Sequence, residues 1–185
     1  PTGKVPLLVI DDDTVLFESA VIAEYINDSA TNAENTLLSS NPLAKAKQRA
    51  WIEFASTMLQ NIAKLYSANN KTLYLEAFNQ LDAKFKVLEQ NICSQGYFDT
   101  TGFSLVDIAF SPIFRYITVF NNILDRQLFS EYKNVASWSQ NLTNRDNVKS
   151  AVSTDYEKLL TKFFSKKDSY FGELTKQHQG SLIEA

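Results

Sequence analysis

The first 26 residues decide the fold, and they read PTGKVPLLVIDDDTVLFESAVIAEYI (residues 1–26). The run from Val5 to Ile10 is too short and too rich in β-branched residues for a helix, and the three aspartates at 11–13 cannot continue a strand. A second apolar run follows at 15–17, and a longer apolar stretch begins after Glu18 and Ser19. This order predicts a β-hairpin with an acidic turn, followed by a helix.

Glu18 and Ser19 stand where the second strand ends and the helix begins. The first backbone N–H groups of a helix have no partner inside the helix, and they favour a negative charge. A carboxylate and a hydroxyl beside these groups form a polar cradle. Such a cradle suits an α-amino acid, because the helix end favours its carboxylate and Glu18 favours its ammonium group.

This arrangement resembles the second half of the thioredoxin-like domain of glutathione transferases. In that family a Val-Pro dipeptide with a cis bond opens the third strand, and a Glu/Gln-Ser pair caps the third helix. The resemblance implies that Val5 pairs its backbone with the cysteinyl backbone of glutathione and that Pro6 holds the cis turn. It also implies that Glu18 and Ser19 bind the γ-glutamyl end and that Lys4 meets a glutathione carboxylate. The alternative is purely structural, because Pro at a strand start and Ser at a helix start are common.

Composition limits the remaining classes of function. The 18 basic and 21 acidic residues give a net charge of −3, which is not typical of a nucleic-acid-binding protein. No apolar stretch is long enough for a membrane span, and the first residues do not resemble a signal peptide. We therefore expect a cytoplasmic protein with neither a nucleic-acid nor a membrane partner. The single Cys93 and the single His178 predict neither a disulfide framework nor a metal site.

Most of the chain after the hairpin has helical periodicity. Asn41 can cap a helix that has Pro42 at its first position, and residues 44–67 then carry apolar side chains at spacings of three and four. A second long helix is predicted for 72–93, which makes an antiparallel helical hairpin with the first. Shorter helices are predicted at 126–131, 135–144 and 147–152, and a last one at 154–171.

Ser104 and Asp107 are three residues apart before an unusually apolar run that extends to about Phe120. This spacing predicts a capping box, in which each residue's side chain binds the backbone N–H of the other. The motif resembles the one that opens the central helix of the glutathione transferase C-terminal domain, where its role is in folding. We therefore interpret Ser104 and Asp107 as structural, and the helix as the centre of a bundle.

Together these features predict an α+β fold that is mostly α. A partial thioredoxin-like domain of a β-hairpin and a helix (1–29) is followed by a linker (30–41). An all-α helical bundle of the glutathione transferase C-terminal type (42–175) comes next, and then a tail (176–185). A two-stranded apolar hairpin is only marginally stable by itself, so a βαβ segment is expected before Pro1.

The resemblance implies a glutathione transferase, with glutathione as co-substrate. The thiol would be conjugated to a small apolar electrophile, as in detoxification, or used to reduce a disulfide. The Ser, Tyr or Cys that activates the thiol is expected before Pro1, so the catalytic residue is unknown. The Lys-Val-Pro motif at 4–6 and the Phe-Glu-Ser-Ala motif at 17–20 are similar to those of omega-like or lambda-like glutathione transferases. A homodimer is implied as well. The candidates for a hydrophobic substrate pocket are Trp51, Phe54, Met58, Phe110 and Phe114, most of which must also serve the core.

A second class of function stays open at this point. The fold could be kept as a docking surface, as in a stringent-starvation-type transcription partner or the accessory domain of a translation factor. Val5, Pro6, Glu18 and Ser19 favour the enzyme, because a pure docking module has no need of a γ-glutamyl cradle. A docking module that descends from an enzyme could also have kept these residues.

Overall fold

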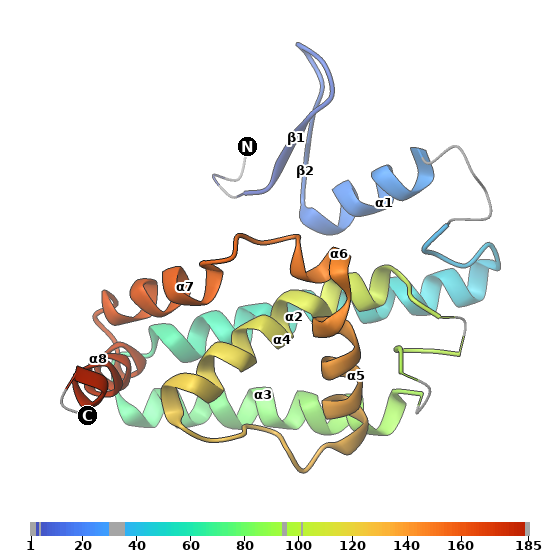
Figure 1. The fold of residues 1–185 in the computed structure, drawn as a ribbon. Coiled ribbons are helices and arrows are strands. Elements are labelled where there is room, and N and C mark those ends of the chain that lie inside the picture. The colour runs from blue at the N-terminus through green and yellow to red at the C-terminus, as the bar shows by residue number, and fades with distance from the viewer. Residues whose placement is uncertain (1–2, 4, 30–35, 94–95, 101, 184–185) are drawn as a thin grey trace.

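A β-hairpin and one helix precede a bundle of helices in the computed structural model, which describes residues 3, 5–29, 36–93, 96–100 and 102–183 (Figure 1). Strand β1 (Leu7–Val9) pairs with β2 (Val15–Phe17) in antiparallel register, with Leu7 opposite Phe17. Helix α1 (Ser19–Ser29) follows β2 directly. The predicted order of strand, turn, strand and helix is confirmed.

The bundle is built around two long helices and one buried helix. Helices α2 (Pro42–Ser67) and α3 (Lys71–Asn91) lie side by side, and α4 (Leu105–Leu124) packs on α2. The Asn41 side chain accepts from the backbone N–H groups of Leu43 and Ala44, both at 3.0 Å. The predicted cap of the first long helix is therefore confirmed, and the fold is mostly α, as expected.

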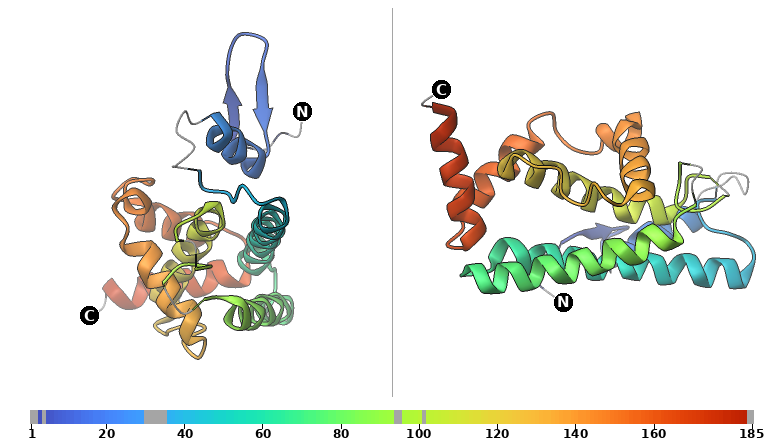
Figure 2. Two further views of the ribbon diagram at one scale, coloured as in Figure 1. Left: turned by 90° about the vertical axis from the view of Figure 1, so that its right-hand side faces the viewer. Right: turned by 90° about the horizontal axis from the view of Figure 1, so that it is seen from below.

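Shorter helices surround this centre: α5 (Lys133–Asn144), α6 (Asp146–Lys149), α7 (Tyr156–Ser165) and α8 (Tyr170–Ile183). Figure 2 shows α8 crossing near one end of α2 and α3. Among the helices of the described residues, none is both long enough and apolar enough to cross a membrane.

Two predictions about these helices are wrong. Residues 126–131 form turns instead of a helix, and the backbone has positive φ at Asp125 (47°) and Phe129 (60°). The helix predicted at 154–171 is two helices, α7 and α8, and α8 continues to Ile183 through most of the predicted tail. The side chain at Phe129 explains the first error, since it is buried in the core and stacks on Phe85 at 4.2 Å between ring centroids.

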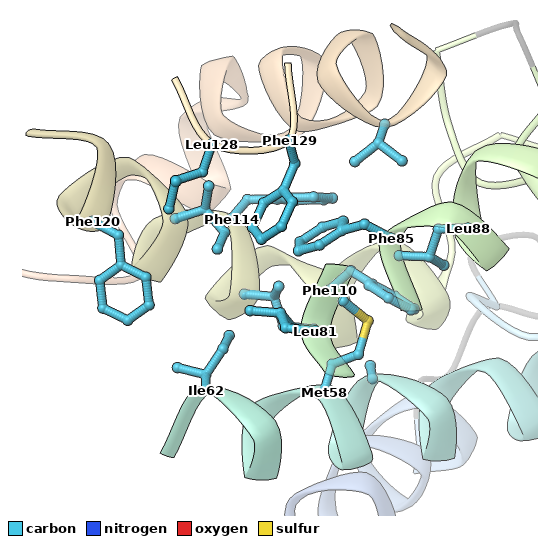
Figure 3. Packing of buried hydrophobic residues seen from close by; sticks show 14 of the residues in the cluster. Met58, Ile62, Leu81, Phe85, Leu88, Phe110, Phe114, Phe120, Leu128 and Phe129 are labelled. Atoms are coloured by element: carbon cyan, nitrogen blue, oxygen red, sulfur yellow. The ribbon is translucent and has the colours of Figure 1, made fainter. Parts of the chain in front are cut away.

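The core is one cluster of buried apolar side chains in which aromatic rings are prominent. Figure 3 shows Met58 and Ile62 from α2, Leu81 and Phe85 from α3 and Phe110 from α4 converging on it. The indole of Trp138 from α5 packs against Phe110 and Phe114 at centroid distances of 4.9 and 5.0 Å. By contrast, the hairpin contributes no residue to this cluster, and only Ile22 of α1 is a buried apolar residue.

Candidate functional site

Four of the five predicted glutathione-binding residues, Val5, Pro6, Glu18 and Ser19, adjoin one end of the hairpin. Leu7, the first residue of β1, lies opposite Phe17, the last residue of β2, so Pro6 before β1 and Glu18 after β2 adjoin the same end of the hairpin. The Val5–Pro6 peptide bond is cis. Figure 1 shows β2 running directly into α1 at this end of the hairpin.

Glu18 and Ser19 are open to solvent at this junction. Glu18 has a left-handed backbone conformation (φ 69°), and its carbonyl accepts the first helical hydrogen bond, from the N–H of Ile22, at 3.0 Å. The turn at Glu18 thus redirects the chain from strand to helix within one residue. It leaves the Glu18 carboxylate and the Ser19 hydroxyl exposed beside the first N–H groups of α1, an arrangement that suits a ligand with both an ammonium and a carboxylate.

Val5 adjoins the same end of the hairpin as the junction, and the acidic turn lies at the other end. Val5 is 90% exposed, so its backbone is accessible, whereas Lys4 lies outside the described residues. The aspartates occupy the opposite end of the hairpin, where Asp11 accepts from the N–H groups of Asp13 (3.1 Å) and Thr14 (2.8 Å). A hydrogen bond from the Thr14 side chain, and after it the bonds from the backbone, lower the pKa of Asp11. No group of metal-ligating side chains is found in the described part of the chain.

The five residues predicted to line a hydrophobic substrate pocket differ in their exposure. Met58, Phe110 and Phe114 are 0, 0 and 2% exposed, because they fill the core cluster. Trp51 and Phe54 are partly exposed, but Trp51 packs its ring on Phe54 (5.3 Å) and on Phe98 (4.9 Å). The apolar spacing of a helix cannot distinguish a core side chain from one that lines a cavity, so a substrate pocket at these residues stays a prediction.

A small apolar cavity lies next to Ser19. It has a volume of about 220 Å³ and lies between α1, α2 and α4. Ser19, Ala20 and Ala23 form its wall on α1, and Ala109 and Pro112 form part of its wall on α4. Small side chains produce this space. The alanines of α1 at a spacing of three are the only sequence signal that could have predicted it.

Sequence reasoning also missed a partly exposed group of rings on α2, α4 and α7, which we call the aromatic face (Tyr66, Tyr116 and Phe163). Tyr66 stacks on Tyr116 at 6.3 Å and meets Phe163 edge-on at 5.7 Å. Phe163 is 42% exposed. Burial, with smaller effects from two neighbouring tyrosines, raises the pKa of Tyr116 to about 12, so its hydroxyl stays protonated and can donate a hydrogen bond. A tyrosine within an apolar stripe often marks the border of a core. The sequence has such a tyrosine at Tyr66 and at Tyr116, so this pattern could have predicted their partial exposure.

The capping box is structural, as predicted. Asp107 is fully buried, and its carboxylate accepts from both the backbone N–H and the hydroxyl of Ser104 at 2.8 Å. It also accepts from the N–H of Phe98 at 3.0 Å and from the indole N–H of Trp138 at 2.7 Å. These partners leave no room for a ligand at Asp107.

Comparison with known proteins gives a consistent result. The family model described as "Glutathione S-transferase, C-terminal domain" matches residues 48–146, and the model "Glutathione S-transferase, N-terminal domain" matches residues 1–29. Glutathione S-transferase-like protein FUS3 of Gibberella moniliformis is 28% identical over 80% of this chain and 70% of its own length. Glutathione S-transferase U19 of Arabidopsis thaliana is 27% identical over 88% of this chain and 72% of its own length. Rice GST1 in complex with glutathione has the same fold, with a TM-score of 0.71, 18% identity and coverage of 94% and 75% of the two chains.

Proposed function

This chain belongs to the glutathione S-transferase family, and we propose that it binds glutathione at the hairpin–helix junction and transfers it to a small apolar substrate. The observation that supports the proposal is the register of β1 and β2, because Leu7 opposite Phe17 brings the segment that contains Val5 and Pro6 to the end of the hairpin where the chain passes through Glu18 into α1. The names of the relatives and the glutathione bound to the rice protein support it.

The four residues have complementary roles in this proposal. The exposed backbone of Val5 pairs with the cysteinyl backbone of glutathione, while Pro6 shapes the turn that presents it. Glu18 accepts from the γ-glutamyl ammonium, and the Ser19 hydroxyl and the start of α1 donate to the γ-glutamyl carboxylate. Lys4 would meet a second carboxylate. Glutathione is thereby fixed by its two ends and its middle, which leaves the thiol free to react.

The reaction requires the thiol of glutathione to lose its proton, because the thiolate is the nucleophile. The thiolate then either forms a bond to an electrophilic carbon and displaces a leaving group, or attacks a disulfide. In the second case the S–S bond of the substrate breaks, one sulfur leaves as a thiolate, and a mixed disulfide forms, from which a second glutathione thiolate releases the other sulfur and gives oxidised glutathione. We assign none of the described residues to the deprotonation step. We infer that the second substrate lies against the aromatic face (Tyr66, Tyr116 and Phe163), because these rings are partly exposed whereas Met58, Phe110 and Phe114 are not.

We also infer a cytoplasmic homodimer with a role in detoxification. The boundaries we propose are a glutathione-binding domain at 1–29, a linker at 30–41 and a helical domain at 42–175, which the last part of α8 extends. The hairpin supports association, since Val9 is 65% exposed and Val15 44% exposed. Apolar strands of this kind are usually covered by further strands or by a partner.

Calorimetric titration of glutathione into the full-length protein tests the binding site. We expect Glu18→Gln and Ser19→Ala each to raise the Kd roughly tenfold, because each removes a hydrogen bond to a charged group. Ser29→Ala, at the other end of the same helix, is the matched control and should leave the Kd unchanged. Equal glutathione affinity in the unmodified protein and its three variants would refute the site. An absence of binding at millimolar glutathione would favour a function as a protein-docking module. With binding established, the products distinguish conjugation (a thioether) from reduction (oxidised glutathione).

A further inference from the structure

A second cavity lies away from the hairpin. Its volume is about 780 Å³, and it is enclosed by α4, the end of α5, α6 and the start of α7. Figure 1 shows this part of the bundle, where the segment from α6 leads back to α7 past α4. No residue of β1, β2 or α1 lines it. The volume is in the usual range for small-molecule sites, roughly 300–1,000 Å³.

The cavity contains a half-buried cation, Arg115, for which no ion pair is found among the described residues. Arg115 projects from α4, and its Nη2 donates to the carbonyl oxygen of Val148 at 2.8 Å, which fixes the guanidinium. The ion pairs of the described residues do not include Arg115. A guanidinium has five N–H donors, so most of its capacity to donate is unused by the protein. A fixed and partly desolvated cation of this kind favours an anionic ligand.

Tyr156 supplies a second donor beside Arg115. It stands at the start of α7 and is half-buried, and no hydrogen bond of its hydroxyl is found within the described part of the chain. Burial raises the pKa of Tyr156, and the charge of Arg115 lowers it by less, so the hydroxyl stays protonated at neutral pH. The hydroxyls of Thr118 and Thr143 already donate to carbonyls of their own helices, at 3.0 and 2.8 Å. The wall therefore offers donors from Arg115 and Tyr156.

The remaining charges limit the ligand to a single negative charge. Lys149 and Lys158 line the cavity, but so do the carboxylates of Asp155 and Glu157, and all four side chains are exposed. Arg115 thus leaves an excess of one positive charge, which suits a monoanion better than a phosphate dianion. Val148 and Val152 provide apolar wall beside these polar groups.

We propose that this cavity binds an organic monocarboxylate, with the carboxylate between Arg115 and Tyr156 and an apolar body against Val148 and Val152. A carboxylate can accept from the guanidinium and the phenol at once, and it would pair with a guanidinium that forms no ion pair within the described residues. The cavity shares no lining residue with the hairpin–helix junction, so this inference is independent of the proposed glutathione site.

The test is titration of full-length protein with 2-naphthoate, and with the neutral 2-naphthamide as its matched analogue, by calorimetry in saturating glutathione. We expect 2-naphthoate to bind at least about tenfold more tightly than the amide, because only the carboxylate pairs with Arg115. Arg115→Met should remove this preference, and Tyr156→Phe should weaken 2-naphthoate roughly threefold to tenfold. Val152→Trp should block both compounds by filling the cavity.

Two controls keep the outcomes distinct. Arg126→Met removes an exposed arginine that lies over Phe78, outside the cavity, and should not affect binding of 2-naphthoate. Ser19→Ala should have no effect either, whatever it does to glutathione affinity. The proposal is overturned if 2-naphthoate does not bind at millimolar concentration or binds no better than the amide. It is also overturned if neither Tyr156→Phe nor Val152→Trp weakens binding, and these two variants decide the matter should Arg115→Met fail to fold.

Discussion

Asp107 joins three segments of the chain through one buried carboxylate. Its oxygens accept from Ser104 at the start of α4, from the N–H of Phe98 in the preceding loop and from the indole of Trp138 on α5. A carboxylate suits this position because it is an acceptor only, and every neighbour that reaches it is a donor. The residue therefore fixes the beginning of the central helix relative to both the loop and α5.

Replacing Asp107 by Asn should destabilise the protein by about 3 kcal/mol, because the amide N–H₂ would face buried donors and leave at least one unsatisfied. Urea unfolding followed by circular dichroism gives the free energy of unfolding. Asp12→Asn, in the exposed hairpin turn, is the matched control and should change it by less than about 0.5 kcal/mol. Glutathione affinity should be unchanged in both variants, and a stability equal to that of the control would contradict the assigned role.

The sequence predicted the near partner of Asp107 but not the distant ones. A spacing of three residues at a helix start is a local pattern, and local geometry alone requires Ser104 and Asp107 to meet. The bond to Trp138 joins residues 31 positions apart, and it depends on how α5 packs on α4. The same limit explains Met58, Phe110 and Phe114, whose burial is set by neighbouring helices and not by their own spacing.

At the scale of elements, the sharp corner between α7 and α8 is the feature that sequence periodicity missed. Ser169 caps α8 by accepting from the N–H of Gly172 at 3.0 Å, and the N–H of Tyr170 donates to the carbonyl of Ala68 at 2.8 Å. These bonds turn the chain across the end of α2. Apolar residues continue on both sides of the corner, so hydrophobic spacing indicates a single helix where the structure has two.

Gly172→Ala should destabilise this corner. A Cβ atom at Gly172 would lie 2.2 Å from the carbonyl oxygen of Lys167 and 3.1 Å from that of Phe164, both of them backbone atoms that cannot move without shifting the corner. We expect the free energy of unfolding to fall by roughly 1–3 kcal/mol, which a lower melting temperature would show.

Gly180→Ala is the matched control on the same helix. Nothing lies within 4 Å of the corresponding Cβ position, and alanine favours the helix, so a gain of up to about 1 kcal/mol is expected. If the two variants melt at the same temperature, the close approach at Gly172 is not what shapes the corner.

At the scale of the whole molecule, polar links hold α1 to the bundle. Asn27 accepts from the backbone N–H of Leu37 at 2.6 Å, and the Arg49 Nε of α2 donates to both carboxylate oxygens of Glu24 at 3.0 Å. Both strands and the hairpin turn are local patterns, and the sequence predicted them. These links were not predictable, because they join segments that only the tertiary fold brings together.

Breaking one of these links should loosen α1 without loosening the bundle. In Arg49→Met we expect the amides of α1 to exchange with deuterium several-fold faster, because α1 buries little apolar surface and depends on such contacts. Hydrogen–deuterium exchange with mass spectrometry resolves α1 from α2 and α3. The effect should shrink at high salt, since an exposed ion pair is screened. Lys176→Met, which breaks the Lys176–Glu173 pair inside α8, is the matched control and should leave α1 unchanged.

Because α1 begins at Ser19, faster exchange in Arg49→Met should be accompanied by weaker glutathione binding. Unaltered exchange in α1 would mean that Glu24–Arg49 has no part in positioning the site.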